Sequence, residues 1–309
     1  MHARSCSPMQ RWRRGAMALS KDRKKGSKQR VRHGYCRLTG EPGRFVKSHI
    51  IPQGLTLGVK EGEPLVQYGA AAGASQRWSS WYDPLLVTRS GEDILADLDT
   101  WAISALRSNR LVWGGWGDDS VLEDLYPLDS VFGVREVFLD TGKLRLFFLS
   151  LLWRAGASQM REFQEIDPPD SHLEIMKTAL LGRGMPGLDF YPIQLTQLST
   201  KGPLHNHAPS RETKYIPNLH APDEDGFPVP FYRFYFDGLI VHFARPDPNS
   251  PAVDQLGKLV VGASSSIVIS TVTYEESLQR KSFERLVMDY LREPARGAPP
   301  AGGALNADP

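Results

Sequence analysis

The sequence predicts an α+β protein, in which an N-terminal module of residues 31–115 packs on a body of helices and antiparallel sheet at residues 116–293. Two stretches lead to this prediction. Residues 34–52 have the pattern of a short hairpin and an apolar strand, and an amphipathic helix follows from Ser90. In the second half, two aromatic runs around Asp237-Gly238 are typical of a β-hairpin with a type I′ turn. The chain of 309 residues is long enough for a substantial core.

Three helices are predicted before the aromatic hairpin. The first begins at a capping box of Ser90 and Asp93 and places four apolar residues on one face. These are Leu95, Leu98, Ala102 and Leu106. The second, Lys143–Ser158, is apolar almost all round, which indicates a central position in a core. The third, Ser171–Leu181, has Asp170 or Ser171 as its cap and ends at Gly182.

The remaining pattern predicts short strands and one more helix. Strands are expected at Leu65–Tyr68, Tyr191–Leu198 and Ser266–Thr273, and the last precedes a helix at Tyr274–Arg292. Residues 199–226 are polar and rich in proline, so we expect a loop there. The tail at residues 294–309 is rich in Pro, Gly and Ala and is expected to be disordered.

Charge is distributed unevenly along the chain. Residues 1–37 contain twelve Lys and Arg residues against one acid, Asp22, whereas the rest of the chain contains 25 basic and 34 acidic residues. A disordered basic arm at residues 1–30 suits a polyphosphate partner such as DNA, although it could equally be a solvated leader that binds nothing. The basic residues assigned to nucleic-acid binding are Lys24, Lys25, Lys28, Arg30, Arg32, Arg37 and Lys47.

Cysteine content and hydropathy indicate a cytoplasmic protein. The two cysteines, Cys6 and Cys36, form no disulfide framework and suit a reducing compartment. The most apolar run, Leu144–Trp153, contains Arg145 and is far shorter than the roughly 20 residues that span a bilayer. We therefore expect no membrane segment, and the sequence does not indicate an oligomeric state.

The order of several segments resembles that of a known family. The N-terminal part contains Cys36-Arg-Leu-Thr39-Gly40, Ser48-His49-Ile-Ile-Pro52 and Leu85-Leu-Val-Thr88-Arg-Ser-Gly91-Glu92. Leu146–Ala155 and Pro186-Gly187…Tyr191-Pro192 follow. Over about residues 34–245 this order is similar to that of bacterial HNH-endonuclease-like proteins. The resemblance implies a ββα-metal module, with a knuckle at Cys36 and a strand that ends at His49.

The chain departs from this family at the zinc-binding positions. The resemblance implies four cysteines, but only Cys36 is present, and Thr39, Thr88 and Gly91 occupy the other positions. A structural zinc site needs about four nitrogen or sulfur ligands. We therefore expect no structural zinc. The knuckle would be held instead by the Ser90 cap and by apolar packing of Leu38, Phe45, Val46, Ile50 and Val87.

The resemblance implies a catalytic role for His49. In HNH-type nucleases the histidine at the strand end activates water, and a divalent cation stabilises the charge on the phosphate. Glu92 and Ser48 occupy the positions nearest the cation-binding roles, which implies Mg²⁺ or Mn²⁺ as cofactor. Ser48 is a poor ligand for such a cation. The alternative for His49 is a structural role, in which the imidazole caps or hydrogen-bonds the knuckle.

A second group of histidines is a further candidate metal site. His205, His207 and His220 could bind Zn²⁺ or Ni²⁺, but in a proline-rich loop they are more often exposed. His242, in the hairpin strand, is expected to be a packed or partly exposed strand residue.

Two functions from different classes remain open. The first is a degenerate HNH-type, metal-dependent DNA endonuclease, favoured by the intact segment at Ser48–Pro52. The second is a catalytically inactive nucleic-acid-binding or interaction protein on the same scaffold, favoured by the lost cysteines. The chain has no P-loop, dinucleotide-binding glycine pattern or nucleophile elbow.

Overall fold

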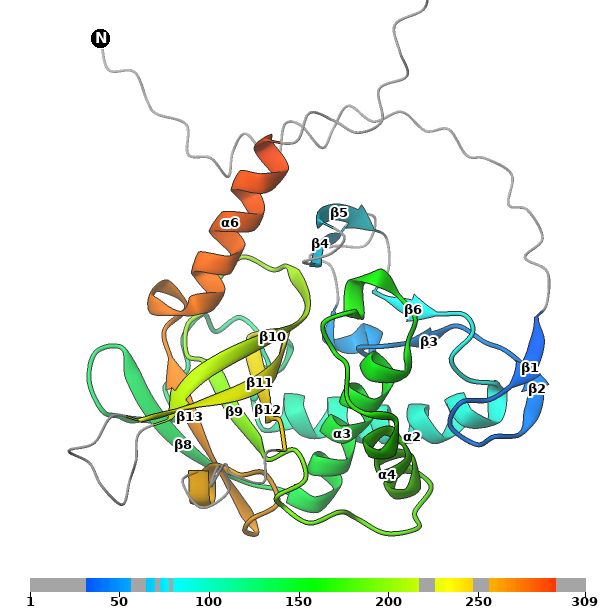
Figure 1. Cartoon of the computed structure of the whole chain (residues 1–309). Helices are drawn as coiled ribbons and strands as arrows, with labels where there is room; N and C mark the ends of the chain where they lie inside the picture. Colours follow the sequence, from blue (N-terminus) through cyan, green and yellow to red (C-terminus); the bar gives the residue numbers. More distant parts are fainter. Residues whose placement is uncertain are drawn as a thin grey trace, which may run out of the picture. The chain divides into compact units, whose positions relative to one another are not determined.

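The computed structural model describes residues 32–56, 65–69, 73–77, 80–216, 226–246 and 256–292. The chain divides into two units, Met1–Arg32 and His33–Pro309. Of the first unit only Arg32 is described, and all other described residues belong to the second. The described part is a mixed α+β structure with four α-helices and a nine-stranded sheet (Figure 1). None of its helices has the length and apolar character needed to cross a membrane. The predicted disordered segments, residues 1–30 and 294–309, lie outside the described residues.

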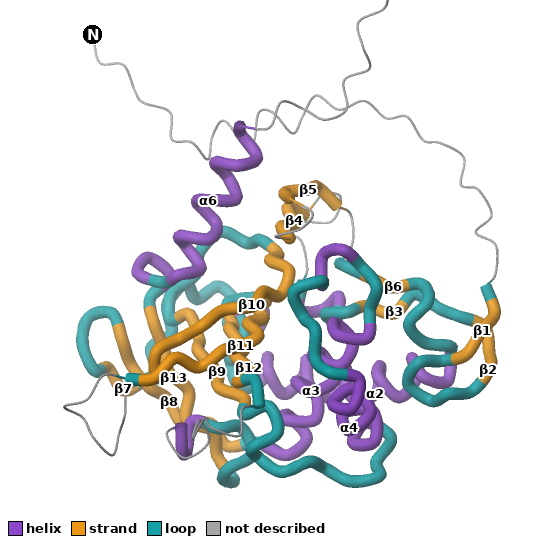
Figure 2. Tube along the Cα trace, viewed as in Figure 1, coloured by secondary structure: helices purple, strands orange, loops and turns teal. Residues whose placement is uncertain are grey.

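The large sheet combines antiparallel and parallel strand pairs. Its strands lie in the order β5-β4-β10-β11-β12-β9-β13-β8-β7 (Figure 2). They are β4 (Leu65–Gly69), β5 (Gly73–Arg77), β7 (Tyr126–Pro127), β8 (Phe132–Phe138), β9 (Ile193–Leu198), β10 (Asn206–Ile216), β11 (Phe227–Phe236), β12 (Leu239–Ala244) and β13 (Ser266–Val272). The pairs β4–β10 and β9–β13 are parallel, and the other neighbours are antiparallel.

Two smaller sheets lie in the N-terminal part. Strands β1 (His33–Tyr35) and β2 (Pro42–Arg44) form a hairpin around the Cys36 turn. Strands β3 (Ser48–His49) and β6 (Tyr82–Asp83) form the second sheet. Helix α2 (Arg89–Ser108) begins six residues after β6. The strand that ends at His49 therefore belongs to a short local sheet and not to the large one.

Helix α2 confirms the predicted apolar face but not the predicted cap. Leu95, Leu98, Ala102 and Leu106 are all buried. The helix begins at Arg89, however, and its N-cap is Thr88, whose side chain makes no capping hydrogen bond. Thr88 also forms a β-bridge with Phe45, which keeps the chain extended up to that residue. Ser90 consequently lies inside the first turn, where it is exposed, so its prediction as the cap is wrong.

Helix α3 (Thr141–Ala157) is the central helix that its composition predicts. Thirteen of its 17 residues are buried. Asp140 caps it by accepting a 2.8 Å hydrogen bond from the Lys143 backbone N–H. Two arginines, Arg145 and Arg154, are buried within this apolar helix. Helix α4 (Asp170–Leu180) packs against α3. Gly182, with a φ of +71°, follows its C-terminal end. The fourth helix, α6, is Leu278–Arg292.

The aromatic hairpin confirms the strongest local prediction. Asp237 and Gly238 link β11 to β12 with φ values of +49° and +82°, as a type I′ turn requires. All six residues of β12 are buried, since this strand lies in the interior of the large sheet.

The predicted loop at residues 199–226 is wrong, because it contains the eleven-residue strand β10. Its register with β11 shifts between His207 and Ser210, and Pro209 lies at this irregularity. Proline lacks an N–H for the ladder and is tolerated at such bulges. The proline content of this segment is therefore the reason why its sequence predicted a loop and not a strand.

One core joins the N-terminal module to the body. A single cluster of buried residues includes Ile50 beside β3, Leu98 of α2, Phe148 of α3 and Val241 of β12. Residues on both sides of the predicted boundary at 115/116 thus share the same core.

Candidate active site around His49

His49 is held by its backbone and leaves its imidazole free. In β3 it pairs with Tyr82 of β6, and the two rings meet edge to face with centroids 6.1 Å apart. Its carbonyl accepts a 3.1 Å hydrogen bond from Arg154 Nη1 of α3. Neither ring nitrogen has a hydrogen-bond partner among the described residues. This arrangement gives no support to a role in which the imidazole hydrogen-bonds the knuckle.

The surroundings keep the imidazole neutral. Burial lowers the pKa of His49, the positive charges of Arg154 and Lys47 lower it further, and Asp99 opposes them. A histidine with a lowered pKa is uncharged near neutral pH, and the uncharged ring is the form that accepts a proton. The state of His49 is therefore compatible with a general base.

Ser48 and Glu92 place unsatisfied oxygen atoms in the same cluster. Burial raises the pKa of Glu92, in the first turn of α2, and the Ser48 hydroxyl and Arg154 counteract this rise. Ser48 is fully buried. Yet neither Ser48 Oγ nor Glu92 Oε2 has a partner with hydrogen-bond geometry among the residues that the structure describes. Two buried oxygens without partners are costly in a folded protein, so a ligand would find acceptors here.

Sequence reasoning missed two members of this cluster, Asp99 and Arg154. Arg154 donates two hydrogen bonds to Asp99, from Nη2 to Oδ1 at 2.6 Å and from Nη1 to Oδ2 at 2.9 Å. Its side chain is only 1% exposed. Asp99 lies seven residues after Glu92, which places both acids on one side of α2. An arginine inside the apolar helix α3 was the other available signal.

The three predicted zinc-binding positions without cysteine, Thr39, Thr88 and Gly91, all lie next to the Cys36 sulfur atom. The Thr39 backbone N–H lies 3.4 Å from Cys36 Sγ, and a Cβ atom at Gly91 would lie 2.5 Å from the same atom. Burial opposes ionisation of the Cys36 thiol, but hydrogen bonds from Thr39 and Thr88 outweigh it and lower the pKa. The expected absence of a structural zinc remains a prediction.

The donor set fits a weakly held divalent cation better than a metal cage. Among the described residues, no group of three or more His, Cys, Asp or Glu side chains is arranged to hold a metal ion. Mg²⁺ commonly binds through one or two carboxylates, with water and substrate phosphate completing its ligands. Glu92 could supply the carboxylate and Ser48 a weak oxygen ligand.

Only part of the predicted nucleic-acid surface lies within the described residues. Lys47 is exposed beside His49, with its Nζ 4.6 Å from the centroid of the Tyr82 ring. Arg37 donates a hydrogen bond to the Ala157 carbonyl at the end of α3, and Arg32 is exposed. Lys24, Lys25, Lys28 and Arg30 lie outside the described residues.

The second histidine group is not an exposed loop cluster. His205 is buried, with Nδ1 at 2.8 Å from the Pro203 carbonyl and Nε2 at 2.6 Å from the Gln279 amide. His207 is in β10, and its Nδ1 lies 2.7 Å from the Ala208 carbonyl. The third member, His220, lies outside the described residues. His242 is buried in β12, as predicted.

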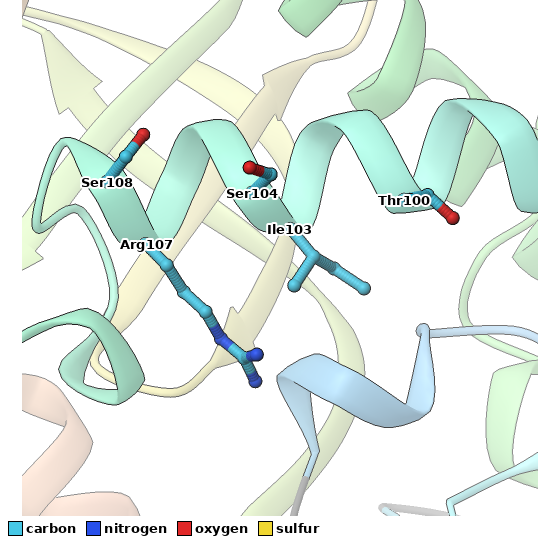
Figure 3. A pocket seen from close by; sticks show the side chains of 5 residues that line it. All are labelled: Thr100, Ile103, Ser104, Arg107 and Ser108. Atoms are coloured by element: carbon cyan, nitrogen blue, oxygen red, sulfur yellow. The ribbon is translucent and has the colours of Figure 1, made fainter.

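A groove of about 530 Å³ lies along α2 (Figure 3). It is lined by Thr100, Ile103, Ser104, Arg107 and Ser108. None of the predicted site residues lines it. No protein-family model, curated protein or solved structure matches this sequence.

Proposed function

We propose that the chain is a divalent-metal-dependent endonuclease that hydrolyses phosphodiester bonds in DNA, built on a degenerate HNH-like ββα module. The observation that carries this proposal is that the free imidazole of His49 and the Glu92 carboxylate, with its unsatisfied Oε2 and the Ser48 hydroxyl, share Arg154 and Asp99 as charged neighbours. A ring that served only to hold the strand would be expected to use its nitrogens for that purpose. Here the backbone carbonyl of His49 makes the structural contact instead.

In this mechanism His49 takes the proton of the attacking water. Water is a poor nucleophile near neutral pH, and a positioned general base typically contributes about 10²–10⁴-fold to the rate. Glu92, with Ser48, would hold Mg²⁺ or Mn²⁺, which when bound stabilises negative charge on the phosphate. Lys47, exposed beside His49, would contact the DNA backbone.

A second function, an inactive nucleic-acid-binding protein, is favoured by Arg154. Its guanidinium, which pairs with Asp99, acts on the pKa of both His49 and Glu92 and so already places one cationic group in the cluster. Like charges repel, so this charge disfavours a second cation at Glu92. The cluster would then stabilise the fold, and Lys47 and the basic arm would bind DNA without cleaving it.

Cleavage of supercoiled DNA distinguishes the two functions. With Mg²⁺ or Mn²⁺, wild-type protein should nick the DNA, His49→Ala should abolish nicking while remaining folded, and Glu92→Gln should need more cation. Asp97→Asn, an exposed acid on the same helix, is the matched control and should cleave normally. Absence of cation-dependent nicking, with unchanged DNA affinity in His49→Ala, would establish the binding function.

The basic arm is tested by the salt dependence of DNA binding. The ten basic residues of the arm, together with Arg32 and Arg37 beyond it, could engage about six phosphates, which gives a slope of about −5 in log K against log salt. A chain that begins at Val31 should bind DNA more weakly and with a smaller slope. Equal affinity and slope in the shortened chain would show that the arm does not bind DNA.

A further inference from the structure

A cluster of basic side chains occupies the face of the large sheet opposite α3. Lys214 of β10, Arg233 of β11 and His242 of β12 lie on neighbouring strands, which Figure 2 shows side by side. Arg233 and His242 are directly paired across β11 and β12. Lys214 Nζ lies 3.1 Å from His242 Nδ1. Three groups that can carry positive charge therefore meet on one sheet face, away from His49.

The described residues offer this cluster little negative charge. Arg233 is 3% exposed, and its Nε lies 3.7 Å from Glu212 Oε1, a long separation for an ion pair. Its Nη2 donates to the neutral amide oxygen of Gln279. Within the part of the chain that the structure describes, Glu212 is the only carboxylate that contacts the three basic residues. Burying positive charge without compensation is costly, so the cluster is electrostatically incomplete.

His242 adds a buried donor that has no partner. Its Nδ1 is the atom that faces the Lys214 ammonium, so Nδ1 accepts and the ring proton is on Nε2. Nε2 is buried and has no hydrogen-bond partner in the described ranges of the chain. The Phe231 ring forms the apolar wall, edge to face with His242 and 5.8 Å from Lys214 Nζ. Two ammonium hydrogens of Lys214 also have no acceptor among the described residues.

We propose that Lys214, Arg233 and His242 form a binding site for a phosphate-type oxyanion. The anion accepts hydrogen bonds from Lys214 Nζ, which His242 Nδ1 holds in place, and Arg233 supplies fixed positive charge behind the ammonium group. Lys214 and Gln194, which pairs with His242 from β9, are half-buried, so the site reaches solvent on their side. The proposal does not depend on the function of His49.

The ionisation of Lys214 supports this proposal. Burial, and then the charge of Arg233, lower the pKa of Lys214 to about 8, and Glu212 opposes them only in part. A bound oxyanion would supply the missing negative charge and stabilise the ammonium form.

Calorimetric titration of the full-length protein with inorganic phosphate, against chloride at matched ionic strength, tests the site. We expect saturable binding by the wild type and at least about tenfold weaker binding by Lys214→Met, which keeps the aliphatic stem over Phe231. Lys258→Met removes an exposed lysine and is the matched control. His242→Phe, which removes the Nδ1 acceptor that holds the Lys214 ammonium but keeps a ring, should also weaken binding and replaces Lys214→Met if that variant does not fold.

The outcomes separate the possible sources of the anion. Loss of DNA affinity in Lys214→Met but not in Lys258→Met would identify a nucleic-acid phosphate as the ligand. Unchanged DNA affinity with lost phosphate binding would identify a free phosphate-type anion. Absence of phosphate binding by the wild type, or equal binding by wild type, Lys214→Met and His242→Phe, would overturn the proposal.

Discussion

Replacement of Gly91 by alanine tests whether the knuckle is held by close packing around the Cys36 sulfur. Gly91 is buried in the first turn of α2. At an open helical position, alanine in place of glycine usually stabilises by roughly 0.5–1 kcal/mol. At Gly91, however, the new Cβ would lie 2.5 Å from Cys36 Sγ and 3.1 Å from Val87 Cβ. A Cβ atom is essentially never found 2.5 Å from a nonbonded sulfur atom, so the chain must shift.

The clash should outweigh the helical preference. Overpacking of a buried site costs about 1–3 kcal/mol, so we expect a net destabilisation of about 1–2 kcal/mol. Cys36→Ala removes the sulfur that the methyl group meets, and the penalty at Gly91 should then largely disappear. The expected coupling between the two changes is about 1–2 kcal/mol, within the range for residues in contact.

Urea denaturation of the two single variants and the double variant measures this coupling. Gly142→Ala is the matched control, because Gly142 also lies in a first helical turn but its nearest neighbour, Asp140 Oδ1, would be 3.6 Å from the new Cβ. It should be neutral or stabilising. The reasoning would be refuted if Gly91→Ala raised stability as the control does, or if its effect were the same with and without the Cys36 sulfur.

Three further predictions concern stability. Asp140→Ala should cost about 1 kcal/mol as the loss of an N-cap, whereas Ser90→Ala should change little; equal costs in urea denaturation would contradict the capping assignments. Arg154→Met leaves the Asp99 carboxylate unpaired and should cost about 3 kcal/mol. Arg280→Met removes an exposed pair with Glu284 and a hydrogen bond to the Glu275 carbonyl, both open to solvent, and should cost much less; a similar loss in both variants would refute a special role for Arg154. Burial lowers the pKa of His205 to about 4, from 6.5. The folded state therefore binds fewer protons than the unfolded state between these values, and stability present above pH 6.5 is lost as the pH falls toward 4. The loss is about 3 kcal/mol, and parallel pH profiles for wild type and His205→Gln would contradict it.

Elements whose signals are local in sequence could be predicted. The apolar character of α3 predicted its burial, because a helix with no polar face must lie inside a core. Asp237-Gly238 predicted the hairpin, since both residues tolerate the positive φ that the turn requires. The placement of His49 at the end of a short strand also followed from the sequence.

Strand β8 was missed because its alternation is inverted. Phe132 and Phe138 are exposed, whereas Arg135 is buried and bonded to Gln197 and Asp124. A pattern with apolar residues outside and a charged residue inside does not resemble a half-buried strand. The buried arginine is tolerated because residues outside the strand, Gln197 and Asp124, accept hydrogen bonds from its Nη1 and Nη2 groups.

The site could be predicted only in part for a similar reason. His49, Ser48 and Glu92 were found because they occur in recognisable segments. Arg154 is 105 residues from His49 in sequence, and its contact depends on how α3 packs. The basic cluster at Lys214, Arg233 and His242 likewise depends on the register of three strands, which pattern reasoning does not provide.

The arginine that links α3 to the end of β3 has a consequence for local opening. Beyond its short pairing with β6, the strand continues with the Ile50 N–H donating to the Trp81 carbonyl at 3.0 Å. A sheet this small would ordinarily open on its own and exchange its amide hydrogens quickly. If it opened, the Arg154 guanidinium would lose its hydrogen bond to the His49 carbonyl but would stay buried against Asp99. The amides of this segment should therefore exchange as slowly as those of the central helix, as part of one cooperative unit.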